Sequence, residues 1–110
     1  MSNKTPYIAE FEELVILAIL KLGSEAYGAS IYEALEEAGR STSIGALYTT
    51  LSRMEEKGLV KSRMGASTPE RGGRAKKYFK VEVSGLRAVQ EREQSRRRLY
   101  STRALIGGAA

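Results

Sequence analysis

The side chains best suited to chemistry in this sequence are cations and hydroxyls. The 110 residues include eighteen Lys or Arg and thirteen carboxylates, all of them Glu, and contain no His, Cys or Asp. This composition excludes His- or Cys-based metal sites, Ser-His-Asp triads and cysteine nucleophiles. The composition does not exclude catalysis by a Ser–Lys pair or by paired Glu residues, but no motif supports either. The sequence also contains no phosphate-binding glycine loop. We therefore expect no enzyme, no catalytic residues, no metal and no cofactor.

The cations are unevenly distributed along the chain. Residues 1–40 contain three Lys or Arg and seven Glu, whereas residues 41–110 contain fifteen Lys or Arg and six Glu. Such asymmetry suggests that the second part binds a polyanion. An anionic membrane surface is a competing polyanion, but the basic residues do not line one face of a strongly amphipathic helix, as membrane binding favours. We expect double-stranded DNA as the partner, and no membrane.

The sequence is typical of a small cytoplasmic protein. Its N-terminus lacks the pattern of a secretory signal, and its longest apolar run, residues 14–20, is shorter than the roughly 20 residues that span a bilayer. The apolar fraction of 42% is sufficient for a globular core.

An apolar stripe with steps of three, four and three residues predicts a helix over residues 43–57. The stripe consists of Ile44, Leu47, Leu51 and Met54. Ser43 and Thr42 can cap the N-terminus of this helix, and Gly58 can end it. The opposite face carries small side chains and hydroxyls, so it could approach another surface closely. An ordinary amphipathic helix with a solvated face is the alternative, but the neighbouring elements favour a recognition helix in DNA.

The rest of the chain predicts further helices and a hairpin around this helix. Helices are expected over residues 9–22, 27–38 and 86–106, and strands over 59–64 and 76–83, joined by a glycine-rich loop over 65–74. Ser84 is expected to cap the last helix. A hairpin after two helices joined by a short turn makes a winged helix. A flexible turn is the alternative for the loop, and its Arg-Gly-Gly is also common in RNA-binding tails. The expected fold is mainly α with a small β-hairpin, a winged helix-turn-helix followed by a C-terminal dimerisation helix.

The first and last helices each suggest contact with a second subunit. The first is apolar on more than one side, which fits either a partner subunit or a fully buried central helix. The last helix has a wholly polar middle, so it is expected to be long and exposed. Arg96-Arg97-Arg98 is expected to lie on a solvated face; a contact with a DNA phosphate is the less favoured alternative. The division is a DNA-binding domain over 1–83 and a dimerisation helix with a frayed tail over 84–110. The expected dimer interface comprises Tyr7, Ile8, Phe11, Leu86, Val89, Leu99 and Tyr100.

Several short motifs, in this order and spacing, resemble the PadR-like family of winged-helix transcriptional regulators. They are Leu14-Val15-Ile16-Leu17, Tyr27-Gly28, Gly45-x-Leu47-Tyr48, Leu51-x-Arg53-Met54-Glu55, Gly58-Leu59-Val60, Gly72-Gly73-Arg74-x-Lys76-Lys77-Tyr78-Phe79 and Ser84-Gly85. The chain departs from the family pattern at Ala46, Thr49 and Ala75, where Thr, Pro and Pro are usual. These departures bear on the operator sequence. Some relatives bind aromatic effectors through a residue such as Trp, which this chain lacks, so no effector is implied residue by residue.

The resemblance implies a sequence-specific DNA-binding regulator, expected to be a repressor that binds an inverted-repeat operator as a homodimer. The implied DNA-binding residues are Ser43, Ala46, Tyr48, Thr49, Thr50 and Arg53 on the central helix, with Arg74, Lys76 and Lys77 on the wing. The alternative is a winged-helix module that binds protein without binding DNA.

Overall fold

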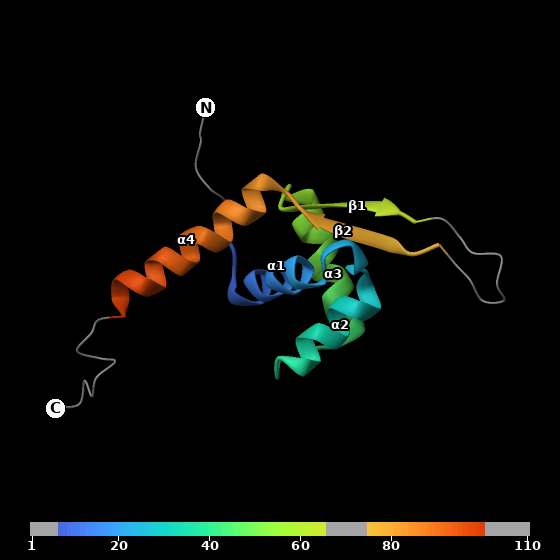
Figure 1. Ribbon diagram of the computed structural model, residues 1–110, viewed down its shortest axis with the longest axis horizontal. Helices are drawn as coiled ribbons and strands as arrows, with labels where there is room; N and C mark the ends of the chain where they lie inside the picture. The colour runs from blue at the N-terminus through green and yellow to red at the C-terminus, as the bar shows by residue number, and fades with distance from the viewer. Residues whose placement is uncertain (1–6, 66–74, 101–110) are drawn as a thin grey trace.

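Five helical segments and one β-hairpin make up the described part of the chain (Figure 1). The computed structural model describes residues 7–65 and 75–100. Its elements are α1 (Glu10–Leu22), the short 3-10 helix η1 (Gly23–Glu25), α2 (Gly28–Glu37), α3 (Ile44–Glu56), β1 (Val60–Met64), β2 (Lys77–Val81) and α4 (Val83–Leu99). This order confirms the predicted fold class of helices with a small hairpin. In the residues described, no helix is long and apolar enough to cross a membrane.

The hairpin is antiparallel and gains a short third segment. Its register runs from Val60 opposite Val81 to Met64 opposite Lys77. The linker before α2 pairs with the free edge of β2, because Tyr27 forms a bridge to Tyr78 and the Phe79 N–H donates to the Ala26 carbonyl at 2.8 Å. The wing is therefore attached through its backbone to the start of the helix-turn-helix.

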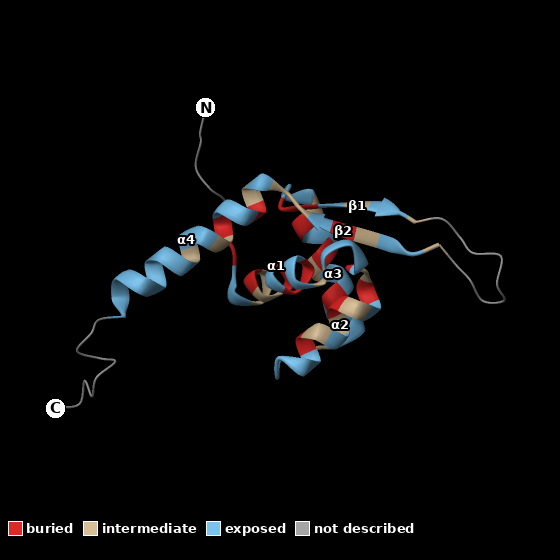
Figure 2. Cartoon of the chain, in the orientation of Figure 1, coloured by how far each residue is buried: buried red, intermediate tan, exposed pale blue. Residues whose placement is uncertain are grey.

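One apolar core joins α1, α2, α3 and the base of the hairpin (Figure 2). Its largest fully buried side chains are Ile8, Val15, Ile16, Ile31, Leu35, Leu47, Leu51, Met54, Leu59 and Val60. Each fully buried side chain of this size contributes about 1.5–3 kcal/mol relative to exposure, so the helices are held mainly by packing.

The ends of α3 are formed as the sequence predicts. The Ala46 N–H donates to the Ser43 hydroxyl at 3.0 Å, which satisfies one of the free donors of the first turn. At the other end Gly58 has a φ of 77°, and the Leu59 N–H donates to the Met54 carbonyl at 2.9 Å. This left-handed ending turns the chain directly into β1.

Three local predictions are wrong. Ile44 is 46% exposed, because it is the first residue of α3 and the buried stripe begins only at Leu47. Ser84 does not cap α4, which begins at Val83; its hydroxyl instead donates to the Gly58 carbonyl at 2.6 Å. The helix ends at Leu99, so the predicted extension through residue 100 is not helical, and residues 101–106 lie outside the described part.

Helix α1 is neither fully buried nor apolar only toward the core. Leu17 and Leu20 are exposed on it, which rules out the fully buried alternative. Ile8, which was expected at the dimer interface, is 1% exposed in the single chain and belongs to its own core. It therefore has almost no surface to offer to a partner.

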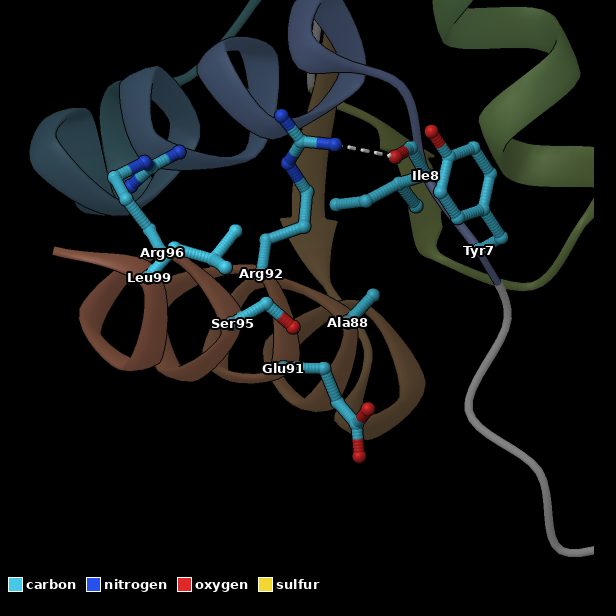
Figure 3. A pocket seen from close by; sticks show the side chains of 8 residues that line it. All are labelled: Tyr7, Ile8, Ala88, Glu91, Arg92, Ser95, Arg96 and Leu99. Carbon is cyan, nitrogen blue, oxygen red and sulfur yellow. Dashed lines mark hydrogen bonds between the residues drawn. The ribbon is translucent and has the colours of Figure 1, made fainter.

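Helix α4 is fastened to α1 by a buried carboxylate. Glu13 on α1 is only 5% exposed, and its Oε1 accepts from Arg92 Nε at 2.9 Å and from Arg96 Nη2 at 3.1 Å. Arg92 also donates to the Ile8 carbonyl at 2.9 Å (Figure 3). Glu13, by hydrogen bonding, raises the pKa of Arg92 above its usual value. Arg96, Arg97 and Arg98 are all exposed, as the sequence predicts for this stretch, although Arg96 also pairs with Glu13.

Replacing Glu13 by Gln should lower the free energy of unfolding by about 1–3 kcal/mol, because two arginines lose their buried counter-charge. Chemical denaturation measures this loss. Glu10→Gln is the matched control on the same helix, since Glu10 pairs with Arg40 at 3.1 Å in an exposed position. It should leave stability nearly unchanged. Equal effects of the two substitutions would contradict the role given to Glu13.

Candidate nucleic-acid interface

The outward face of α3 is a polar surface built on a rigid apolar one. Leu47, Leu51 and Met54 fix the inner face in the core. The outer face exposes Ser43, Ala46, Thr49 and Arg53, and Thr50 lies half-buried at its edge. Spacings of three and four residues place Ala46, Thr49 and Arg53 along one line of the helix. Five of the six residues predicted for this helix thus lie on or beside one accessible surface, and the sixth, Tyr48, flanks it.

Tyr48 is held against the start of α2. Its ring is half-exposed, and its hydroxyl lies beside Gly28, where an added Cβ would stand 2.1 Å from the Tyr48 oxygen. Only glycine leaves room for the ring at this place. The sequence identified Gly28 only through the family resemblance, and it gave no sign that the partner of this glycine is Tyr48.

Of the two described wing lysines, Lys76 directly precedes β2 and Lys77 is its first residue. They point to opposite faces of the hairpin, because successive side chains of an extended chain alternate. The Lys76 ammonium lies over the Tyr27 ring, 4.2 Å from its centroid. The Lys77 ammonium lies 3.7 Å from the Glu55 carboxylate of α3. Both side chains are exposed, and they contact different neighbours. Arg74, the third predicted wing residue, lies outside the described residues.

An aromatic and cationic stack that the sequence analysis missed fixes the base of the wing. The rings of Tyr27 and Tyr78 meet edge to face at 5.6 Å, and the Arg63 guanidinium lies 4.8 Å from the centroid of Tyr78. With Lys76 over Tyr27, the order is cation, ring, ring, cation. The alternation of side chains along β1 and β2 is the only feature of the sequence that could have predicted Arg63 and Tyr78 on the same face of the hairpin.

Glu55 connects α3 to the hairpin. Its carboxylate accepts from the Ser62 hydroxyl at 2.7 Å and faces Lys77. The recognition face and the wing are therefore linked by side chains as well as by the turn at Gly58. Among residues 7–65 and 75–100, no group of three or more acidic, His or Cys side chains could hold a metal ion.

Most residues expected at a dimer interface lie around the N-terminal segment and α4. Tyr7 and Leu99 are 81% and 85% exposed, Tyr100 and Leu86 are exposed, and Phe11 and Val89 are partly buried. Tyr7 and Leu99 line a hollow of about 450 Å³, together with Arg92 and Arg96 (Figure 3). Two large apolar side chains that are this exposed and border one hollow are unusual on a small monomer.

Gly28→Ala should force the Tyr48 ring out of its place while the fold survives, because the ring can swing toward solvent. A double-mutant cycle with Tyr48→Ala should give a coupling free energy of about 0.5–3 kcal/mol, since the added methyl clashes only when the ring is present. Gly45→Ala is the control: nothing lies within 4 Å of its added Cβ, so it should be neutral or slightly stabilising. Additivity of Gly28→Ala and Tyr48→Ala would show that the ring is not held there.

Solved structures share this arrangement. A PadR-like transcription factor from Bacteroides fragilis is 28% identical, with a TM-score of 0.67, over 91% of this chain and 89% of that chain. A PadR family transcription regulator from Clostridium difficile is 28% identical, with a TM-score of 0.64, over 81% of this chain and 90% of that chain. Bacillus subtilis PadR in complex with operator DNA has the same fold at 20% identity, with a TM-score of 0.62, over 76% of this chain and 47% of that chain. No curated protein sequence matches this one.

The model of the transcriptional regulator PadR-like family matches residues 16–91, which include α2, α3, the hairpin and the first half of α4. This match confirms the predicted regulator and the prediction that the chain is not an enzyme. The chain belongs to the PadR-like family of transcriptional regulators.

Proposed function

We propose that this protein is a sequence-specific, DNA-binding repressor that acts in the cytoplasm as a homodimer on an inverted-repeat operator. The observation that carries the proposal is the outer face of α3. This face combines side chains small enough for close approach with hydroxyls and one exposed arginine, on a helix whose inner face is fully buried. Such a helix can enter the major groove without deforming.

Each exposed group on α3 has a role that its chemistry suits. Arg53 can donate two hydrogen bonds to a guanine edge. Thr49 can either form a hydrogen bond with a base edge through its hydroxyl or contact a thymine methyl through its own methyl group. Ala46 gives the clearance for the backbone to come close. Ser43 uses an oxygen lone pair for the cap, so its O–H remains for a phosphate. Tyr48 and Thr50, at the edges of the face, suit phosphate contacts.

The wing supplies the electrostatic part of the proposed interface. Lys76, just before β2, and Lys77, at its start, are exposed on opposite faces of the hairpin, so they can reach different phosphates or the edge of the minor groove. Arg74 is proposed to join them on the ground of sequence. The Bacillus subtilis relative with the same fold is known in complex with operator DNA, which supports DNA as the partner.

Binding to a duplex should weaken steeply as salt rises, because neutralised phosphates release counterions. If each of two subunits makes roughly 3–5 phosphate contacts, the slope of log K against log salt should be about −5 to −9. The experiment is selection of bound fragments from a random DNA pool, followed by titration of the selected site at several salt concentrations. A slope near zero would rule out the DNA-binding function and favour a protein partner.

Arg53→Ala should weaken operator binding by roughly 1–3 kcal/mol and relax the preference at one base position, because it removes a base contact. Its side chain is exposed, so the melting temperature should stay unchanged. Arg87→Ala is the matched control, since Arg87 is also exposed but lies on α4, away from the proposed DNA surface. Equal affinities of the two variants would mean that α3 does not read the operator.

The proposed dimer uses the C-terminal part of the chain, residues 84–110, as its association element. Tyr7, Leu99 and Tyr100 are exposed large apolar side chains, and the hollow between the N-terminal segment and α4 lies beside them. Packing this region against its symmetry mate would bury them and relate the two α3 helices by a two-fold axis. Half-sites should then be about one helical turn, roughly 10 bp, or a multiple apart.

Leu99→Glu should lower the mass in light scattering from dimer to monomer and abolish operator binding at the same protein concentration, because a charge would enter the apolar contact. Ala38→Glu introduces the same charge at an exposed position at the end of α2 and should change neither property. A monomeric variant that kept full operator affinity would show that dimerisation is not needed for DNA binding.

A further inference from the structure

We infer that the groove between the end of α1, the hairpin and the start of α4 binds an amphipathic organic anion, namely a carboxylate that carries an aliphatic chain. The groove encloses about 600 Å³, within the range of small-molecule sites. Its lining residues are Ile19, Leu20, Gly23, Ser24, Lys61, Ser62, Arg63, Tyr78, Phe79, Lys80, Val81 and Leu86. This site does not overlap the face of α3 and does not depend on the DNA-binding function.

The apolar part of the lining fits an aliphatic chain. Leu20 and Leu86 are large apolar side chains that remain exposed, one on each helix that borders the groove. Branched aliphatic side chains impose no directional requirement on their partner, so a flexible alkyl chain can bury its surface against them.

The charged part of the lining fits a carboxylate. Lys61 and Lys80 stand directly opposite each other in the antiparallel ladder, and both are exposed. Like charges in this position destabilise a hairpin unless an anion lies between them. Within residues 7–65 and 75–100, neither of these lysines nor Arg63 has a carboxylate within 4 Å.

Arg63 is already positioned for such a ligand. It lies opposite Tyr78 in the same register, so it leaves the sheet on the same face as Lys61 and Lys80. Its guanidinium is held over the Tyr78 ring, which reduces the rotamer freedom that it must lose on binding. The three cations thus require a ligand with a negative charge, and the two leucines require that the same ligand carry an apolar part.

Calorimetric titration of the full chain with decanoate below its micellar concentration tests the inference. Decanoate should bind, octanoate should bind roughly tenfold more weakly for two fewer methylenes, and decanol and decyltrimethylammonium should bind at least about tenfold more weakly for lack of the negative charge. Equal binding of decanoate, decanol and the ammonium ion would overturn the inference, because it would reduce the site to a non-specific apolar patch.

Two sets of variants, each with a matched control, locate the site. Lys61→Gln and Lys80→Gln should each weaken decanoate binding by roughly tenfold, whereas Lys21→Gln, on α1 outside the lining, should not. Leu20→Ala should weaken it by about fivefold, whereas Leu17→Ala, equally exposed on the same helix, should not. Without ligand, Lys61→Gln should melt no lower than the parent, because it relieves the repulsion with Lys80, so weaker binding cannot be ascribed to unfolding.

A last comparison separates a free ligand from a membrane. Vesicles of phosphatidylglycerol present the same combination of alkyl chains and negative charge. Free decanoate that binds with the stated dependence on Lys61, Lys80 and Leu20 supports the inference. Binding to vesicles alone, with no uptake of decanoate, would overturn it and assign the groove to a lipid surface.

Discussion

The position of α4 depends on one buried charge. Along this helix only Gly85 and Ala88 are buried, so apolar packing provides little attachment. Gly85 lets the first turn approach the Leu59 carbonyl, where a Cβ would stand at 2.4 Å. Farther along, the attachment is electrostatic, because Arg92 and Arg96 converge on Glu13. Such a cluster requires a specific geometry, and it therefore sets the direction in which the second half of α4 leaves the body (Figure 1).

The orientation of α3 depends on a different kind of constraint. Its inner face is fixed by close packing, and each of its sides is held by a neighbour: Tyr48 against Gly28 of α2, and Glu55 against Ser62 of β1. These contacts are specific in shape or in hydrogen bonding, so they define an angle where apolar packing alone would permit several. The side chains of the outer face are therefore not needed to orient the helix, and they remain available to contact a partner.

Patterns within one element predicted the fold well, whereas contacts between distant elements were not predictable. The stripe at Leu47, Leu51 and Met54, the Ser43 cap and the Gly58 ending each follow from the local geometry of a helix. The pairing of Glu13 with Arg92 joins residues far apart in the sequence, and many other carboxylate and arginine pairs would satisfy the same composition. The periodicity also extended the apolar stripe to Ile44, because a pattern does not reveal where the covering elements end. The residues on the outer face of α3 were predictable because the same helical periodicity that places the apolar stripe inward places them outward.

The hairpin shows how a short segment can serve more than one purpose. Strand alternation sends Lys77 toward Glu55 and α3, and it sends Lys80 toward the opposite face, beside Lys61. What distinguishes the two faces is their surroundings. Near α3, Lys77 lies beside the Glu55 carboxylate, which also accepts from the Ser62 hydroxyl, and its exposed ammonium suits the solvated phosphates of a duplex. Beside the end of α1 the cations border a hollow with exposed leucines, where a duplex is too wide to enter and only a ligand with its own apolar part can displace the water. Lysine therefore suits different anions on the two faces of the hairpin. Its charge attracts any anion, whereas the shape of the surrounding surface and the apolar side chains beside it determine which anion fits.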